Sequence, residues 1–258
     1  MPLSALTFLA LSACFFAPSV EGDGDVRTEL REVPPAEGVV LEGAIDVTVT
    51  ASDRTTVEVT CDANLLPYIA TEVVDGALWV RTTHDGLPVN LDPTGPCAVA
   101  VGLPQLQVVR LVGSGLIEVL GQGSVLLGEL ELTGSGEVVV APTIAGARLD
   151  VALSGSGDLT LAAVEVASVD VALSGSGDVT VGQGAADTLD LALTGSGDAG
   201  LGQLVTRDVR VVLSGSGDAA VHATESIEAV LTGSGDLAIA GDPGRRDVDV
   251  TGSGDVDG

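Results

Sequence analysis

The sequence predicts an all-β protein, a parallel β-helix (β-solenoid) with coils of about 20 residues and stacked Gly-Ser-Gly-Asp turns. Three observations lead to this fold class. A Gly-Ser-Gly tripeptide recurs through the second half of the chain, and apolar residues alternate with polar or small ones on both sides of it. Aromatic residues are few, with one Trp, one Tyr and three Phe, which suits a narrow interior filled by Val, Leu and Ala.

The repeat has an almost constant length. Eight copies of Gly-Ser-Gly begin at residues 113, 134, 155, 175, 195, 215, 233 and 252, so successive copies are 21, 21, 20, 20, 20, 18 and 19 residues apart. A propeller blade needs about twice as many residues for its four strands, so one solenoid coil per repeat fits better. With coils about 4.8 Å apart, the eight copies would form a rod about 40 Å long.

Each glycine motif joins two short strands. Residues 150–161 read DVALSGSGDLTL, with apolar residues at every second position before and after the glycines. This period of two predicts strands with one buried face, and it places Ala152, Ala172 and Ala192 at outward positions between buried Val and Leu. Because the following repeats read almost the same, the regular part of the solenoid is expected from about residue 105.

The glycines are expected to line up at one corner of the stack. Glycine tolerates positive φ, and it leaves room where a Cβ would meet the neighbouring coil. The serine between the two glycines is present in every copy. A catalytic serine would differ from its neighbours, so no nucleophile is indicated.

An acidic residue follows most of the motifs. Stacking would place these carboxylates in a row, and like charges about 5 Å apart repel unless they are solvated, bonded to turn N–H groups or bridged by cations. Solvated or turn-capping aspartates are the main expectation, with calcium as an alternative, although a 20-residue period does not match the calcium-binding nonapeptide repeat. The row consists of Glu137, Asp158, Asp178, Asp198, Asp218, Asp236 and Asp255, with Leu116 in the first copy.

The first residues predict export. Residues 1–13 form an apolar run too short to span a membrane, typical of a signal peptide. Leu-Ser-Ala-Cys at residues 11–14 resembles the bacterial lipobox, which makes Cys14 a lipid anchor, and the Phe at position 15 favours the outer membrane over inner-membrane retention. Residues 14–37 are acidic, rich in Gly and Pro and without periodicity, so a lipid-anchored tether is expected before a domain at 38–258.

The segment between the tether and the repeats carries irregular strand patterns. Strands are expected at residues 45–49, 57–60 and 77–81, and residues 64–70 could form one helical turn. Cys61 and Cys97 remain as an even pair once Cys14 is set aside, which favours a disulfide in an oxidising compartment. The alternative, that Cys61 and Cys97 are two unpaired buried thiols, stays open, because spacing alone does not place their Cα atoms within bonding range.

Several blocks together resemble one bacterial family. They are the Gly-Ala-Ile-Asp-Val-Thr-Val stretch from Gly43, the CDANLLPYIATEVVDGALWV block from Cys61, the lead-in from Leu103 to Leu111 and the ladder of GSG-D motifs. The chain is similar over about residues 38–258 to the DUF2807-type head GIN domain, a family described as a putative auto-transporter adhesin. The resemblance implies a β-helical domain, usually on a secreted lipoprotein, with no established enzymatic activity.

A polysaccharide lyase or hydrolase is the enzyme alternative, because other β-helices carry carboxylates on neighbouring coils. Such a site should break the repeat locally, and a lyase usually needs basic residues beside its carboxylates. His84 and His222 are interpreted as surface residues. The basic residues in the repeats are Arg110, Arg148, Arg207, Arg210, Arg245 and Arg246. We therefore expect no enzyme.

The predicted function is that of a non-enzymatic, adhesin-like binding protein of the cell envelope, whose partner is an envelope protein or a glycan. The formal charge of −27 argues against nucleic acid, and membrane contact is expected only through the lipid anchor, on the periplasmic or the surface side. An envelope scaffold or signalling partner is the alternative. Whether the chain forms homo-oligomers stays open, because either oligomerisation or capping could cover the unpaired backbone of the last coil.

Overall fold

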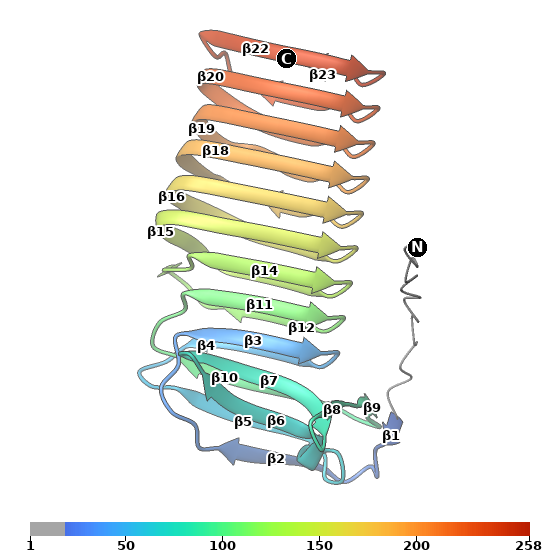
Figure 1. Ribbon diagram of the computed structural model, residues 1–258. Helices are drawn as coiled ribbons and strands as arrows, with labels where there is room; N and C mark the ends of the chain where they lie inside the picture. Colours follow the sequence, from blue (N-terminus) through green and yellow to red (C-terminus); the bar gives the residue numbers. More distant parts are fainter. Residues whose placement is uncertain (1–18) are drawn as a thin grey trace, which may run out of the picture.

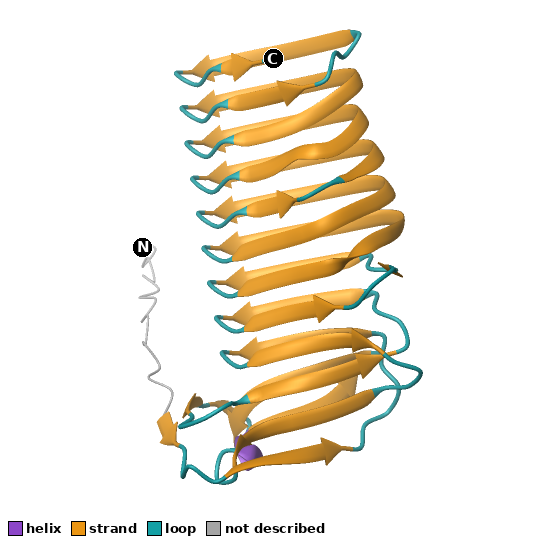
Figure 2. Ribbon diagram, turned by 180° about the vertical axis from the view of Figure 1, so that it is seen from behind, coloured by secondary structure: helices purple, strands orange, loops and turns teal. Residues whose placement is uncertain are grey.

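The computed structural model describes residues 19–258. The protein is a β-solenoid of stacked coils, 71% strand and 1% helix, that is broader and less regular at its N-terminal end (Figure 1, Figure 2). The expected fold class is confirmed. The residues before Ser19, which include Cys14 and the expected signal peptide, lie outside the described part of the chain.

The strands divide into an irregular N-terminal group and a regular C-terminal group. The first group is β1 (Ser19–Glu21), β2 (Val26–Arg31), β3 (Gly38–Gly43), β4 (Asp46–Ala51), β5 (Thr56–Asp62), β6 (Ile69–Val74), β7 (Ala77–His84), β8 (Leu87–Pro88), β9 (Asn90–Asp92) and β10 (Ala98–Leu103), with a 3₁₀ turn η1 (Leu66–Tyr68) before β6. The second group is β11 (Val108–Gly113), β12 (Leu116–Leu120), β13 (Ser124–Val125), β14 (Glu129–Gly134), β15 (Glu137–Gly155), β16 (Asp158–Gly175), β17 (Val179–Val181), β18 (Gly184–Gly195), β19 (Ala199–Gly215), β20 (Ala219–Gly233), β21 (Leu237–Ala240), β22 (Arg245–Gly252) and β23 (Val256–Asp257).

Every coil contributes one segment to each of two parallel sheets. The segments that end at the first glycine of the motif form the sheet nearer the viewer in Figure 1, here called the front sheet. It contains β3, β11, β14, the C-terminal halves of β15, β16, β18, β19 and β20, and then β22. The segments after the motif form the back sheet: β4, β12, the first residues of β15 and β16, β17, the first residues of β19 and β20, β21 and β23.

The predicted alternation places the core between the sheets. Along β16, for example, Val169, Val171 and Leu173 are almost completely buried, whereas Ala172 and Ser174 between and beyond them face solvent. Stacking repeats this arrangement on each coil, so aliphatic side chains form continuous inward columns. The sequence prediction that the alanines between buried Val and Leu point outward is confirmed.

The N-terminal end is closed by antiparallel strands. On the front sheet β7 pairs parallel with β3, and β6 then pairs antiparallel with β7. On the back sheet β10 pairs parallel with β4, β5 pairs antiparallel with β10, and β2 pairs antiparallel with β5. The strands expected at residues 45–49, 57–60 and 77–81 and the helical turn within 64–70 are found as β4, β5, β7 and η1.

The expected tether needs correction over its described part. Residues 19–31, assigned by composition to the tether, form β1 and β2: β1 pairs with β9, and β2 with β5 of the main sheet. Residues 26–31 carry no pattern of alternating burial, because β2 is an edge strand whose residues are mostly exposed. The described part of the folded domain therefore includes β1 and β2. None of the helical structure in residues 19–258 is long and apolar enough to cross a membrane.

Candidate functional site

The glycine column is the feature that sets the register of the stack. The first glycine of each motif has positive φ, 128° at Gly175 for example, and a Cβ there would lie 2.1 Å from the carbonyl oxygen of Gly155 on the preceding coil. The second glycine has no such φ, but a Cβ at Gly177 would lie 2.0 Å from the carbonyl oxygen of Gly157. Both positions therefore admit only glycine without a shift of the backbone.

This column extends one coil further than the sequence motif. Gly43 pairs in register with Gly113, has a φ of 149°, and stands where the other coils have the first motif glycine. Gly43-Ala44-Ile45-Asp46 is thus a degenerate Gly-Ser-Gly-Asp turn, and Asp46 pairs with Leu116 at the position of the acidic row. The sequence carried this signal as a glycine three residues before an aspartate.

The aspartate ladder binds the backbone of the turns. Asp178 donates its N–H to Oδ1 of Asp158 at 3.2 Å, and Asp198 donates to Oδ1 of Asp178 at 2.9 Å. The same bond recurs at 2.8 Å from Asp218 to Asp198, from Asp236 to Asp218 and from Asp255 to Asp236. Stacked carboxylates are tolerated because Asp158, Asp178, Asp198, Asp218 and Asp236 each accept a hydrogen bond in an exposed turn, which is the turn-capping role expected for them.

The residue type decides where the turn N–H goes. Asp158 follows a coil that carries Glu137, and its N–H donates to the carbonyl oxygen of Gly136 instead, at 3.1 Å. Glu137, which follows Leu116, likewise donates to Gly115 at 3.0 Å. Only the short Asp side chain captures the next N–H. No group of three or more His, Cys, Asp and Glu side chains within residues 19–258 is arranged to hold a metal ion, and no cofactor is indicated.

A shallow groove runs across the coils on the outer side of the front sheet. Its volume is about 470 Å³, and it spans the coils from Glu129 to Val212. The floor is a row of exposed small side chains, Ala152, Ala172 and Ala192, which stand in register on successive strands. The alanines also line an adjoining groove of about 370 Å³.

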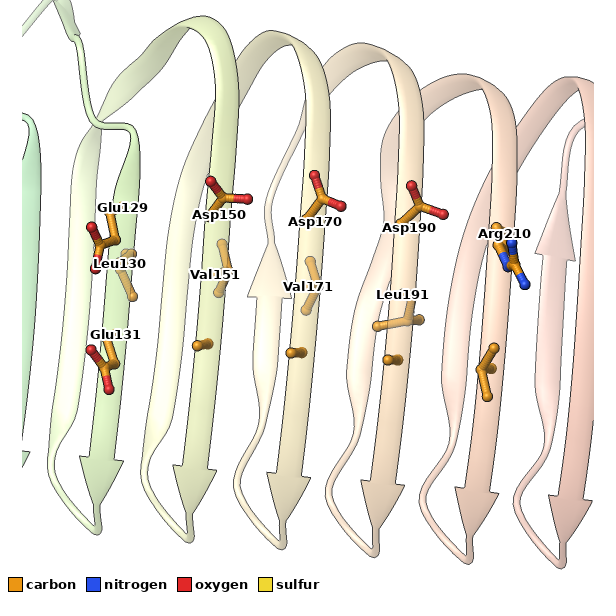
Figure 3. A pocket seen from close by; sticks show the side chains of 14 residues that line it. Glu129, Leu130, Glu131, Asp150, Val151, Asp170, Val171, Asp190, Leu191 and Arg210 are labelled. Carbon is orange, nitrogen blue, oxygen red and sulfur yellow. The ribbon is translucent and has the colours of Figure 1, made fainter.

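The two walls of this groove differ chemically. One wall is a row of carboxylates, Glu129, Asp150, Asp170 and Asp190, that ends at Arg210 (Figure 3). The other wall, on the side of the glycine turns, is a row of hydroxyls, Thr133, Ser154, Ser174 and Thr194. We call the two grooves together the front groove: an apolar floor between an acidic wall and a hydroxyl wall.

Arginines partly neutralise the acidic wall. Nε of Arg148 lies 2.8 Å from Oδ1 of Asp150, and its Nη2 lies 3.1 Å from Oδ2 of Asp170. The hydrogen bond to Asp150, together with the charges of Asp170 and Asp150, raises the pKa of Arg148. Arg110 pairs in the same way with Glu129, and that bond raises the pKa of Arg110. Three of the four carboxylates of the wall, Glu129, Asp150 and Asp170, are thus paired with arginines.

The expected disulfide is present at the N-terminal end. Cys61 and Cys97 are bonded at 2.03 Å, with Cα atoms 4.1 Å apart. The next residue, Asp62, is a fully buried carboxylate. It accepts hydrogen bonds from the N–H of Thr94 at 2.8 Å, the hydroxyl of Thr94 at 2.9 Å and the N–H of Gly24 at 2.9 Å. The backbone bond from Thr94 is the main cause that lowers the pKa of Asp62, and burial opposes it.

A second surface lies where this N-terminal end meets the regular stack. Two grooves, of about 740 and 860 Å³, share Glu42, Arg81, Thr83 and Gly86 in their lining. Arg81 stacks 4.2 Å over the ring of Trp79 and forms ion pairs with Glu42, at 2.7 Å, and with Glu72. The N–H groups of the Arg81 guanidinium are thus already paired with two carboxylates, and its face is already stacked on an aromatic ring.

The structure does not assemble a catalytic group from the candidate residues. His84 lies in ring contact with Tyr68, with centroids 5.0 Å apart, and His222 lies on the back sheet. Neither faces the serines of the front groove. Three arginines of the repeats, Arg110, Arg148 and Arg207, pair with surface carboxylates, Arg207 with Glu225 at 3.0 Å.

Sequence reasoning missed the acidic wall of the front groove. Asp150, Asp170 and Asp190 each stand five residues before the first glycine of a motif, and Glu129 occupies the same offset one coil earlier. A residue type that recurs at a fixed offset in a repeat becomes a column in the stack. That offset was the signal that could have found the wall.

The comparisons with known proteins agree with this architecture. The model of the DUF2807 family, described as "Putative auto-transporter adhesin, head GIN domain", matches residues 37–243. The chain belongs to this family. No curated protein matches the chain in sequence.

Solved structures similar to this DUF2807 protein extend along nearly the whole domain. A putative lipid binding protein from Parabacteroides distasonis is 25% identical with a TM-score of 0.83, and the match covers 92% of this chain and 99% of that one. A putative adhesin from the same organism is 26% identical, with a TM-score of 0.79 and the same coverage. A putative adhesin from Parabacteroides merdae, 21% identical over 93% and 99% of the two chains with a TM-score of 0.79, shares the fold.

Proposed function

We propose that this protein is an exported, adhesin-like binding protein of the cell envelope that acts through the front groove and not by catalysis. The observation that carries the proposal is the groove itself: successive coils add the same chemical rows of acceptor oxygens, methyl groups and hydroxyls in strict register. An enzyme site needs a local departure from the repeat, whereas a surface that binds a repeating partner needs its continuation. Membership of a family described as adhesins supports this function.

The chemistry of the groove favours a linear, hydroxyl-rich glycan as the ligand. Carboxylates and side-chain hydroxyls bond to sugar hydroxyls, and the alanine floor offers a flat apolar strip for the sugar C–H faces. A ligand with a repeating unit that runs along the stack would meet equivalent groups on each coil. The charge of −27 disfavours anionic polymers.

The proposed location rests on the first residues of the sequence. We propose that Cys14 is acylated and holds the protein at the outer membrane, with the domain on the periplasmic or the surface side. Ser19, the first residue of β1, is five positions after Cys14, so the link is at most about 18 Å long. The anchor would therefore hold the N-terminal end of the solenoid near the membrane. Replacing Cys14 by Ser should release the protein from washed membranes, and retention of the variant would contradict the anchor.

The experiment that tests the binding site uses two faces of one coil. Ala172 lies on the floor of the front groove, and Thr180 is exposed on the back sheet of the same coil. Binding of the full chain to a glycan and envelope-protein array identifies the ligand, with calcium and with chelator in parallel. Ala172→Arg should weaken capture about tenfold or more, and Thr180→Arg, which adds the same charge, should leave it unchanged. Equal effects of the two variants would contradict the front groove as the site.

A protein partner is the second candidate, which corresponds to a scaffold in the envelope. Val212 and Val230 continue the alanine row toward the C-terminal end and are 39% and 41% exposed, so the floor there is more apolar. Capture of envelope proteins without any glycan, lost in Val212→Arg and kept in Thr180→Arg, would favour this function.

A further inference from the structure

The strand β2 is the outermost strand of the back sheet at the N-terminal end of the solenoid (Figure 1, bottom). It pairs with β5 on one side, and no strand within residues 19–258 pairs with its other side. All of its residues but the last are exposed, among them Val26 at 40% and Leu30 at 77%. A free strand edge of this kind presents unpaired N–H and C=O groups to another strand.

The hydrogen bonds to β5 show which backbone groups of β2 are free. The carbonyl oxygen of Asp25 accepts a hydrogen bond from the N–H of Ala63 at 2.9 Å, which continues the ladder between the two strands by one residue. Backbone groups along an antiparallel strand point alternately to the two sides. The N–H and C=O groups of Val26, Thr28 and Leu30 therefore point away from β5, toward the free side.

The residues between these three carry charges of alternating sign on one face of the strand. Nη2 of Arg27 lies 2.6 Å from Oδ2 of Asp25, and Nη2 of Arg31 lies 2.7 Å from Oε2 of Glu29. The partners of β2 on this face of β5 are buried apolar residues, so the charges lie on the core side of the sheet edge. Inward charges at an edge are a known obstacle to a strand of arbitrary sequence.

The strand β2 is complementary to itself when a second copy lies antiparallel to it about a two-fold axis at Thr28. Each facing pair is then opposite in charge, apolar, or a pair of hydroxyls. The pairs are Asp25 with Arg31, Val26 with Leu30, Arg27 with Glu29, and Thr28 with Thr28 of the other copy. The free backbone groups of both copies also face one another in this arrangement, so the hydrogen-bond ladder continues across the axis.

The neighbouring registers bring like charges together. With the axis at Glu29, this residue would face its own copy, and Arg27 would face Arg31. With the axis at Arg27, two guanidinium groups would meet, and Asp25 would face Glu29. Like charges directly opposite each other destabilise a strand pair, and opposite charges stabilise it. The charges of β2 therefore favour one register and exclude the registers beside it.

We propose that β2 is a dimerisation strand, which joins two copies of this chain at their N-terminal ends so that the two back sheets become continuous. The contact is isologous, since the same strand serves both copies, and it therefore closes at a dimer and does not form filaments. The alternating charges admit a second β2 and keep other strands from the edge. The proposal does not depend on the ligand of the front groove.

The test uses two variants that repel their own copies and attract each other. In a dimer of one variant, Arg27→Glu places carboxylates opposite each other across the axis, and Glu29→Arg places guanidinium groups there. In a mixed dimer of the two variants each of these positions faces the opposite charge again. As controls, Arg245→Glu and Glu165→Arg make the same two charge changes at exposed positions of the stack.

Sedimentation velocity of the full chain in detergent, over a range of concentrations, measures the dimer dissociation constant. We expect the natural chain to form dimers and each β2 variant to raise the constant about tenfold or more. An equimolar mixture of the two β2 variants should associate like the natural chain, and so should each control variant. A natural chain that stays monomeric, or a mixture that associates no better than either variant alone, would overturn the proposal.

A further variant, Thr28→Pro, tests the backbone pairing without a change of charge. The N–H of Thr28 points away from β5, so proline removes a hydrogen bond of the dimer and none of the ladder to β5. Circular dichroism checks that the variant is folded, and its dimer dissociation constant should also rise about tenfold or more. Dimers of the folded variant that are as tight as those of the natural chain would overturn the proposal as well.

Discussion

The N-terminal end and the regular stack achieve the same closure of a core by different means. In the stack, neighbouring coils meet through backbone at the glycine corner, where the N–H of Ser176 donates to the carbonyl oxygen of Gly155 at 2.8 Å and Gly175 and Gly177 place no Cβ between the coils. At the N-terminal end a disulfide and the buried carboxylate of Asp62 hold segments that are far apart in sequence. Stacking needs only repetition, whereas a cap needs specific side chains.

The difference extends to the core. Among residues 19–258 the buried polar or charged residues are Asp62 and Thr206, so the stack interior is almost entirely aliphatic. An aliphatic column can be extended by any number of coils. The hydrogen bonds from Gly24 and Thr94 to the buried Asp62, here called the Asp62 clamp, can form at only one place in the chain. The comparison predicts that the two regions fail under different treatments.

The largest effect is expected from the glycine column. Gly175→Val with Gly177→Val places two branched side chains where even a Cβ meets the backbone of the preceding coil at 2.0–2.1 Å. Because this backbone has no flexible atoms to yield, we expect a loss of about 5 kcal/mol or more in the free energy of unfolding. Thermal melting measures it. An unchanged melting temperature would contradict the role of the corner.

The disulfide should matter mainly for the N-terminal end. Its cysteines are 36 residues apart, so a chain-entropy model gives a loss of about 4 kcal/mol for Cys61→Ser with Cys97→Ser. Limited proteolysis should then cut residues 19–107 before the stack. Simultaneous loss of both regions would show that cap and stack unfold as one unit.

Acid should loosen the N-terminal end through Asp62. Its folded pKa lies below the ordinary carboxyl value because the Thr94 N–H bonds the ionised form. The carboxylate therefore stabilises the fold above the ordinary pKa of about 3.9, and this contribution is lost as the pH falls through the lower folded value.

Hydrogen exchange of the Gly24 and Thr94 amides between pH 7 and pH 2 checks this. Asp62→Asn should speed their exchange at pH 7 and flatten the dependence on pH. Asp53→Asn, at an exposed turn, is the control. Identical profiles for the natural chain and Asp62→Asn would refute the clamp.

The smallest effect is expected from the aspartate ladder. Asp178→Ala removes the acceptor of the Asp198 N–H, at a cost of about 1 kcal/mol or less. The effect is limited because that N–H can turn to the Gly177 carbonyl, as the Glu137 N–H does to Gly115. Asp178→Asn keeps an acceptor oxygen and should melt like the natural protein. A large rise in melting temperature with calcium, abolished by Asp178→Ala, would instead assign the ladder to a cation.

Repetition explains how much of this fold the sequence could predict. The period fixed the coil, the alternation fixed which side chains face the core, and Asp158 to Asp255 were placed in one row because equal offsets become columns. A Cys61–Cys97 disulfide was favoured because two cysteines remain once Cys14 is set aside. Only the structure shows that the two residues lie close enough to form it. Asp62 lies outside the repeats and has no equivalent at a fixed offset in other coils, so no repeat pattern could have predicted its role.

The parts that escaped prediction are those with pairings between distant segments. β2 looked like tether because its partner, β5, begins 25 residues after β2 ends. Asp62 gave no sign of burial, because the hydrogen bonds that make burial possible come from Gly24 and Thr94, 38 and 32 positions away. In the site, the alanine floor was foreseen as exposed, and the acidic wall beside it was not.

The most direct test of the account separates the contact at the glycine corner from every other property of glycine. Gly177 and Gly200 both lack positive φ, but a Cβ at Gly177 would lie 2.0 Å from the Gly157 carbonyl oxygen, whereas a Cβ at Gly200 would meet Thr180 at an ordinary 3.5 Å. Melting of Gly177→Ala and Gly200→Ala, each against the natural chain, is the measurement. We expect Gly177→Ala to lose about 3 kcal/mol and Gly200→Ala to be neutral or slightly more stable. Equal melting temperatures of the two variants would contradict a stack held in register by backbone contact at one corner.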